Sequence, residues 1–86
     1  MHRRVTVTSG AGLHARTAAR LVEVATQAAE DVTVTKVSTG RSVSARSMLS
    51  VLTLDVHCGE EILLEVGSTD GAPLLDRLAA AVQEDG

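Results

Sequence analysis

The sequence predicts an α+β fold in which a small antiparallel sheet is covered on one face by helices. Two observations lead to this prediction. Four short segments alternate apolar and polar residues, and two longer segments repeat apolar residues at helical spacing. Because each strand-like segment alternates, one face of the sheet is expected to be buried and the other to lie in water. That pattern favours antiparallel pairing.

Strands are expected at residues 5–8, 31–35, 41–44 and 61–66, where β-branched and aliphatic residues alternate with polar ones. Gly40 lies in the short turn between the second and third of these segments, so the two are expected to form a hairpin. The residues expected to face the core from the second and fourth strands are Val32, Val34, Ile62, Leu64 and Val66.

The first helix is expected to run from His14 and to fade over residues 26–30, with Leu13 packed against its first turn. Its apolar face consists of Ala18, Leu21, Val22 and Ala25. A last helix is expected after Asp70, a predicted N-cap, with Pro73 in its first turn, where a missing N–H is no loss. Its apolar face consists of Leu75, Leu78, Ala79 and Val82.

Residues 47–54 are rich in apolar side chains and fit either a strand or a short helix. If they form a helix, Ser47 is a plausible N-cap. The apolar residues of this segment would cover more than one helical face. The segment is therefore either buried all round or exposes apolar surface to a partner.

Composition narrows the classes of function. At 86 residues the chain is expected to be a single domain, residues 1–86, with an aliphatic core, because Phe, Tyr and Trp are absent. The net charge of −3 and the missing aromatics argue against nucleic-acid binding. We predict no membrane insertion and a cytoplasmic location, since no long apolar run occurs and Cys58 is the only cysteine. We expect no cofactor and no metal site, because His57 and Cys58 find no further ligands at suitable spacing.

The stretch from Gly12 to Thr17 carries the candidate chemistry. It places His14 at a helix start, where backbone N–H groups lack intrahelical partners and the helix dipole is positive. A neutral imidazole there could attack a phosphoryl donor. The amides of Ala15, Arg16 and Thr17 are placed to receive the added negative charge, and the Arg16 guanidinium suits phosphate oxygens. A lone histidine followed by arginine is nevertheless most often an ordinary helix start.

Two motifs raise this site above that ordinary interpretation. Gly12-Leu13-His14-Ala15-Arg16 resembles the active-site signature of HPr, the histidine-containing phosphocarrier protein of the bacterial phosphoenolpyruvate–sugar phosphotransferase system. Ser44-Ala45-Arg46-Ser47-Met48-Leu49 resembles the regulatory-serine segment of that family and its short apolar helix. The resemblance covers nearly the whole chain. It implies an open-faced βαββαβα sandwich, with a four-stranded antiparallel sheet and three helices on one face.

The resemblance also implies roles for individual residues and partners. His14 would be phosphorylated on Nδ1 by enzyme I, with Arg16 as its partner in the transfer site, and the IIA unit of a sugar permease would be the acceptor. Met48, Leu49 and Val51 would form the apolar docking surface. Ser47 would match the serine phosphorylated in some bacteria, so a serine kinase and a transcription regulator are further candidate partners. The chain would form a phosphohistidine intermediate rather than act as a stand-alone enzyme.

The sequence departs from the family pattern beside His14. Thr17 stands where the family usually has proline, and Ala11 where it often has Asn or Ser. Thr17 adds an N–H and a hydroxyl, which we expect to loosen the helix start.

These departures keep a second hypothesis open, in which the chain is a regulatory interaction module on the HPr fold with weak or no phosphotransfer. A small-ligand-binding sandwich is a third hypothesis, but the sequence gives no sign of a closed apolar pocket. Ser47 as a plain N-cap, and Met48 and Leu49 as simple core residues, also remain open.

Overall fold

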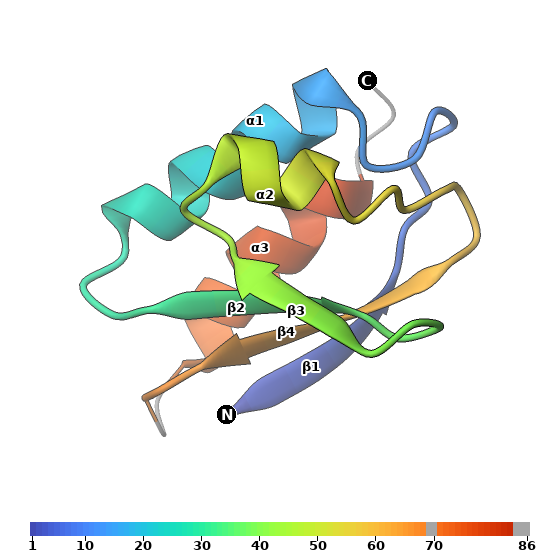
Figure 1. Ribbon diagram of the computed structural model, residues 1–86. Coiled ribbons are helices and arrows are strands. Elements are labelled where there is room, and N and C mark those ends of the chain that lie inside the picture. Colours follow the sequence, from blue (N-terminus) through green and yellow to red (C-terminus); the bar gives the residue numbers. More distant parts are fainter. Residues whose placement is uncertain (69–70, 84–86) are drawn as a thin grey trace.

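A computed structural model describes residues 1–68 and 71–83. Its sheet has four antiparallel strands in the order β1-β4-β2-β3, and three helices cover one face (Figure 1). The predicted fold class is therefore confirmed. The elements in chain order are β1 (His2–Thr6), α1 (Ala15–Gln27), β2 (Val32–Lys36), β3 (Arg41–Ser44), α2 (Met48–Leu52), β4 (Glu61–Val66) and α3 (Ala72–Gln83).

Strands β3 and β4 have the predicted bounds, and β2 and β3 form the predicted hairpin. Strand β1 differs, since it begins at His2 and ends at Thr6 rather than spanning residues 5–8. The reason is its partner: β4 offers pairing positions as far as Glu65, which lies opposite His2. Val7 lies beyond the strand but still donates its N–H to the Glu60 carbonyl at 2.9 Å.

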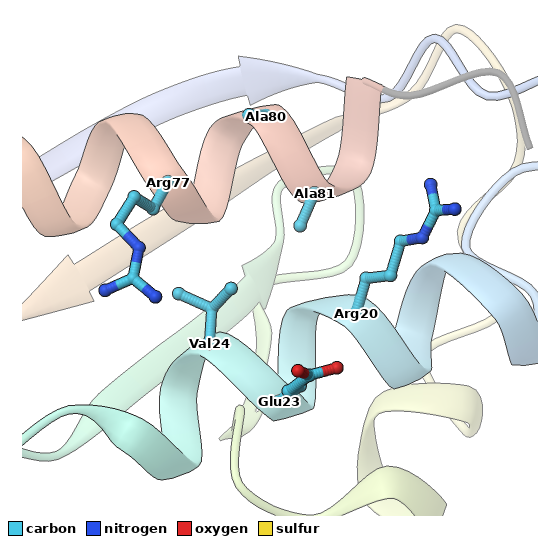
Figure 2. A pocket seen from close by; sticks show the side chains of 6 residues that line it. All are labelled: Arg20, Glu23, Val24, Arg77, Ala80 and Ala81. Carbon is cyan, nitrogen blue, oxygen red and sulfur yellow. The ribbon is translucent and has the colours of Figure 1, made fainter.

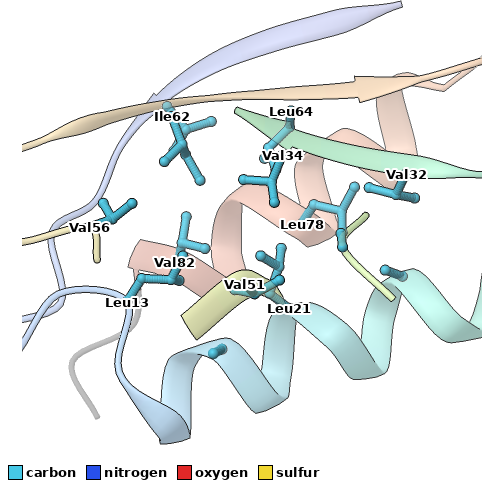
Figure 3. Close-up of a cluster of buried hydrophobic side chains, with 14 of the residues drawn as sticks. Leu13, Leu21, Val32, Val34, Val51, Val56, Ile62, Leu64, Leu78 and Val82 are labelled. Carbon is cyan, nitrogen blue, oxygen red and sulfur yellow. The ribbon is translucent and has the colours of Figure 1, made fainter. Parts of the chain in front are cut away.

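The core lies between the sheet and the helices and is aliphatic, as predicted (Figure 3). Strands β2 and β4 contribute alternate residues to it, because side chains along a strand point to opposite faces. The largest side chains that are fully buried come from α1, β4 and α3, and all face this layer: Leu21, Ile62, Leu64, Leu75 and Leu78.

Helix α1 buries the predicted Ala18, Leu21 and Ala25, whereas Val22 is only partly buried. Helix α3 begins at Ala72, so Pro73 lies in its first turn, as predicted. The predicted N-cap Asp70 lies outside the described residues. The open choice for residues 47–54 is settled as a helix, α2. None of the helices among residues 1–68 and 71–83 is long and apolar enough to cross a membrane.

Candidate functional site

Helix α1 begins immediately after His14, which is its N-cap residue. The backbone of His14 is extended, with φ −90° and ψ −174°, and its side chain turns back over the first turn. The Arg16 N–H donates to His14 Nδ1 at 3.2 Å. The imidazole is half-buried, while Ala15 and Arg16 are exposed. The structure thus places the half-buried imidazole of His14 and the first amides of α1 at one helix end, with the exposed Arg16 next to them in the chain.

The hydrogen bond from Arg16 selects between the two tautomers of the neutral imidazole. A neutral imidazole has one nitrogen that donates and one that accepts. Because Nδ1 of His14 accepts, its lone pair lies on Nδ1 and the ring proton on Nε2. The Nδ1 lone pair points at a backbone amide of the helix start.

The turn that leads into His14 is held by a distant loop. Gly12 has φ +75° and is buried, and its N–H donates to the Ser9 carbonyl at 2.8 Å. Leu13 is 4% exposed, and its N–H donates to the Val56 carbonyl at 2.9 Å. Val56 belongs to the connection between α2 and β4. The position of His14 therefore depends on a contact between segments more than 40 residues apart.

Thr17 is fully buried, and its hydroxyl donates to backbone carbonyls of this turn. Its Oγ1 lies 3.0 Å from the Gly12 oxygen and 3.2 Å from the His14 oxygen. The expectation that Thr17 loosens the helix start is therefore wrong. The hydroxyl ties the first turn of α1 to the residues that precede it.

Ser47 is the N-cap of α2. Its Oγ accepts the N–H of Ser50 at 3.2 Å, and its carbonyl accepts the N–H of Val51 at 3.0 Å. The side chain is half-buried. Ser47 therefore has the capping role that the sequence left open. A regulatory role for the same hydroxyl is compatible with capping.

Helix α2 divides its apolar residues between the core and the surface. Leu49 is 75% exposed, and Met48 is partly buried against the core. Val51 is fully buried, so its predicted place on a docking surface is wrong, and it is a core residue. Leu52, which is 36% exposed, shares the surface with Leu49 instead. The i, i+3 spacing of the two leucines was the available signal for that pairing.

The loop between α2 and β4 contains a network centred on Glu60. Its carboxylate accepts the His57 N–H at 2.7 Å and lies 3.7 Å from Lys36 Nζ. Ser38 Oγ adds a hydrogen bond at 3.4 Å. The pKa of Glu60 is lowered from its ordinary value of 4.5, chiefly by the His57 hydrogen bond and then by the positive charge of Lys36.

This network predicts a pH dependence of stability. Because the pKa of Glu60 is lower in the folded protein, its stabilisation is present above pH 4.5 and is lost as the pH falls through the lowered value. We expect Glu60→Gln to lower the urea midpoint at neutral pH and to match the parent at the acid end. The measurement is urea unfolding, followed by far-UV circular dichroism, from neutral pH down to about pH 3. A difference that stays constant with pH would contradict the prediction.

An open groove of about 450 Å³ lies between α1 and α3 (Figure 2). Its polar rim includes Arg77, which donates to Gln27 Oε1 at 3.1 Å. The residues that line it are Arg20, Glu23, Val24, Arg77, Ala80 and Ala81, and none of the predicted site residues is among them. Within the described part of the chain, no cluster of three or more His, Cys, Asp or Glu side chains could hold a metal ion.

A comparison of the sequence with known protein families shows to which family the chain belongs. A family described as PTS HPr component phosphorylation site matches residues 1–84. The chain belongs to the HPr family. The resemblance inferred from the two motifs is therefore confirmed, and a phosphocarrier of this family is the function that the match supports.

Individual relatives agree with this assignment. The phosphocarrier protein HPr of Streptomyces coelicolor is 44% identical over 82 residues, which are 95% of this chain and 87% of the relative. The HPr-like protein Crh of Bacillus subtilis is 35% identical over 85 residues, or 99% and 98% of the two chains. A crystal structure of HPr from Bacillus anthracis superimposes with a TM-score of 0.86 at 32% identity, covering 96% of each chain.

Proposed function

We propose that this HPr-family protein accepts a phosphoryl group from enzyme I on His14 Nδ1 and passes it to the IIA unit of a sugar permease. The observation that carries the proposal is the Nδ1 lone pair of an accessible histidine, directed at the first amides of a helix. An imidazole so placed can attack phosphorus without first losing a proton from the attacking atom.

In the proposed step, the bond between phosphorus and its carrier atom on enzyme I breaks as a bond from phosphorus to Nδ1 forms. The leaving atom keeps the electron pair, and the ring proton on Nε2 is free to pass to water. The Arg16 N–H, which donates to Nδ1 at rest, then turns to a phosphoryl oxygen. The amides of Ala15 and Thr17 and the Arg16 guanidinium add to the positive field. All of these groups lie at one helix end and leave the outer side of the phosphoryl open, so the second transfer is not blocked.

We propose that Leu49 and Met48, together with Leu52, form the surface on which both partners dock. Leu49 is exposed on a short helix, and its exposure would be explained if a partner protein covers it on binding. Ser47 caps the same helix, so a phosphoryl group added to its Oγ by a serine kinase would put negative charge beside this surface. That modification would weaken docking with a partner that presents acidic groups.

The proposed carrier role is tested by incubating the protein with enzyme I and phosphoenolpyruvate and measuring its mass before and after mild acid. We expect the gain of a single acid-labile phosphoryl group, which His14→Ala abolishes. The matched controls are His2→Ala and His57→Ala, which remove the other two histidines and are expected to keep the gain. No acid-labile gain in the parent, or an undiminished gain in His14→Ala, would refute the role of His14.

The docking surface is tested by Leu49→Asp. We expect the KM of enzyme I for this protein to rise about ten-fold with little change in kcat, because Leu49 would contact the partner but not the reacting atoms. The matched control is Ala80→Asp, which adds the same charge to an exposed position of α3. Equal kinetics in the two variants would remove Leu49 from the docking surface.

A regulatory module is the second candidate function, supported by the similarity to the HPr-like protein Crh over 99% of this chain. On this hypothesis the α2 surface binds a transcription regulator and His14 transfers nothing. Phosphoryl transfer through His14 at a rate typical of the family would reject it. Its support would be a partner whose binding Leu49→Asp abolishes while His14→Ala leaves it intact.

A further inference from the structure

Thr17 has a buried hydroxyl that no part of the proposed transfer step uses. Thr17 is the third residue of α1, and its side chain is fully buried. Its single hydroxyl proton is shared between the carbonyl oxygens of Gly12 and His14. We propose that Thr17 is a positioning residue for phosphoryl transfer, which acts by fixing these two carbonyls and so the direction of the His14 imidazole. This inference rests on the function proposed above.

The two carbonyls lie on either side of the residue that carries the chemistry. The Gly12 carbonyl precedes Leu13, and the Thr17 hydroxyl is the donor that the structure gives it. The His14 carbonyl also accepts the Ala18 N–H at 2.8 Å, the first hydrogen bond of α1. With the Leu13 N–H held by Val56, the Gly12–Leu13 peptide unit has hydrogen bonds at both its carbonyl and its N–H, and the peptide unit that follows His14 is held at its carbonyl. These two peptide units lie on either side of the Leu13–His14 peptide and so limit how far the Cα–Cβ direction of His14 can turn.

This direction matters because the single lone pair of Nδ1 accepts the Arg16 N–H, 3.2 Å away, at rest and has to turn from that amide to phosphorus during transfer. A small rotation of the peptide before His14 would move the ring by a large fraction of that distance. Misplacement by about 1 Å can cost on the order of 100-fold in rate. Without the hydroxyl, the Gly12 carbonyl would lie in a buried turn without this donor, and the turn would relax to find another.

Three variants isolate the hydroxyl. Thr17→Val replaces it with a methyl group of nearly the same shape, and Thr17→Ser restores it without the γ-methyl. The matched control is Thr26→Val: Thr26 also lies on α1 and donates to a carbonyl three residues back, that of Glu23 at 2.9 Å, but it is exposed and far along the helix. Should Thr17→Val fail to fold, Thr17→Ala and Thr17→Ser form a second pair that differs by the hydroxyl alone.

The variants are compared by three measurements. The first is kcat and KM for transfer from enzyme I. The second is the rate of phosphorylation by phosphoramidate, in which the P–N bond of the reagent breaks, ammonia leaves and the bond to Nδ1 forms without a partner protein. The third is the ¹⁵N chemical shift of His14 Nδ1, which reports the hydrogen bond from Arg16.

We expect Thr17→Val to lower kcat and the phosphoramidate rate about ten-fold with KM nearly unchanged, a loss equivalent to about 1.4 kcal/mol. It should also shift the Nδ1 resonance, whereas Thr17→Ser and Thr26→Val stay close to the parent. Thr17→Val that keeps the parent's phosphoramidate rate and Nδ1 shift would overturn the inference. If the parent reacts with phosphoramidate but not with enzyme I, the proposed function fails while the comparison of Val with Ser still decides the role of Thr17.

Discussion

Gly12→Ala is expected to lower the free energy of unfolding by about 2 to 5 kcal/mol, the sum of backbone strain and overpacking. Gly12 has φ +75°, a conformation that alanine adopts only at a cost. A Cβ at this position would also lie 2.8 Å from the Cα of His57 and closer still to the Val56 carbonyl oxygen. Both contacts are with backbone, so a side-chain rotation cannot relieve them. The measurement is urea unfolding followed by circular dichroism, since the chain has no aromatic residue for fluorescence.

Gly40→Ala is the matched control for this prediction. Gly40 has the same φ of +75°, but no heavy atom lies within 4 Å of a Cβ built there. It should therefore show the backbone strain alone, about 1 to 2 kcal/mol. The excess loss in Gly12→Ala then measures the close approach of the His14 turn to the loop at Val56. If the two variants were destabilised equally, that approach would carry no weight in the fold.

The strands differ in how closely the sequence predicted their bounds. The alternation of apolar and polar residues was enough to place β4 at its observed bounds, because one face of this strand lies in the core. The bounds of β3 were also predicted, although Val43 is its one apolar residue and is only partly buried. The predicted bounds of β1 were shifted toward the C-terminus because His2, Arg3 and Arg4 are polar and do not alternate with apolar residues. Only the pairing with β4 shows that these three residues belong to a strand. Local pattern predicts a strand when its own residues alternate, but not when a partner recruits polar ones.

Helix α2 illustrates a second limit. Apolar residues occupy both sides of this segment, so periodicity could not decide which side faces the core. The docking place that the family resemblance implied for Val51 is wrong, because Val51 is fully buried. Its burial follows from how the helix is docked, with Leu49 outward, and that docking depends on residues elsewhere in the chain. The role of Thr17 was missed for a similar reason. A threonine near a helix start has several carbonyls within reach, and only the structure identifies Gly12 and His14 as its acceptors.

Arg46→Met is expected to lower the free energy of unfolding by about 1.5 to 3 kcal/mol, the range for hydrogen bonds that involve a charged group. The guanidinium of Arg46 donates to the carbonyls of Ala28 and Glu30, both at 2.9 Å, and more weakly to that of Ala25 at 3.4 Å. Helix α1 has no basic residue in its own last turn. Arg46 therefore supplies the cation that the negative end of the helix dipole favours, from the loop that leads into α2.

Two further variants separate the carbonyl contacts from other effects. Asp31→Asn removes the ion pair with Arg46 at 3.6 Å, and because Asp31 is 98% exposed in its side chain, we expect almost no change in stability. Arg41→Met removes an arginine whose guanidinium makes one long contact among residues 1–68 and 71–83, to the Thr53 carbonyl at 3.4 Å, and should also cost little. If Arg46→Met were no more destabilising than Arg41→Met, the carbonyl contacts would not be what joins these segments. If Arg46→Met is the more destabilising of the two, amide hydrogen exchange should be faster in the last turn of α1. Exchange should then also be faster at Ser47, the N-cap residue next to Arg46.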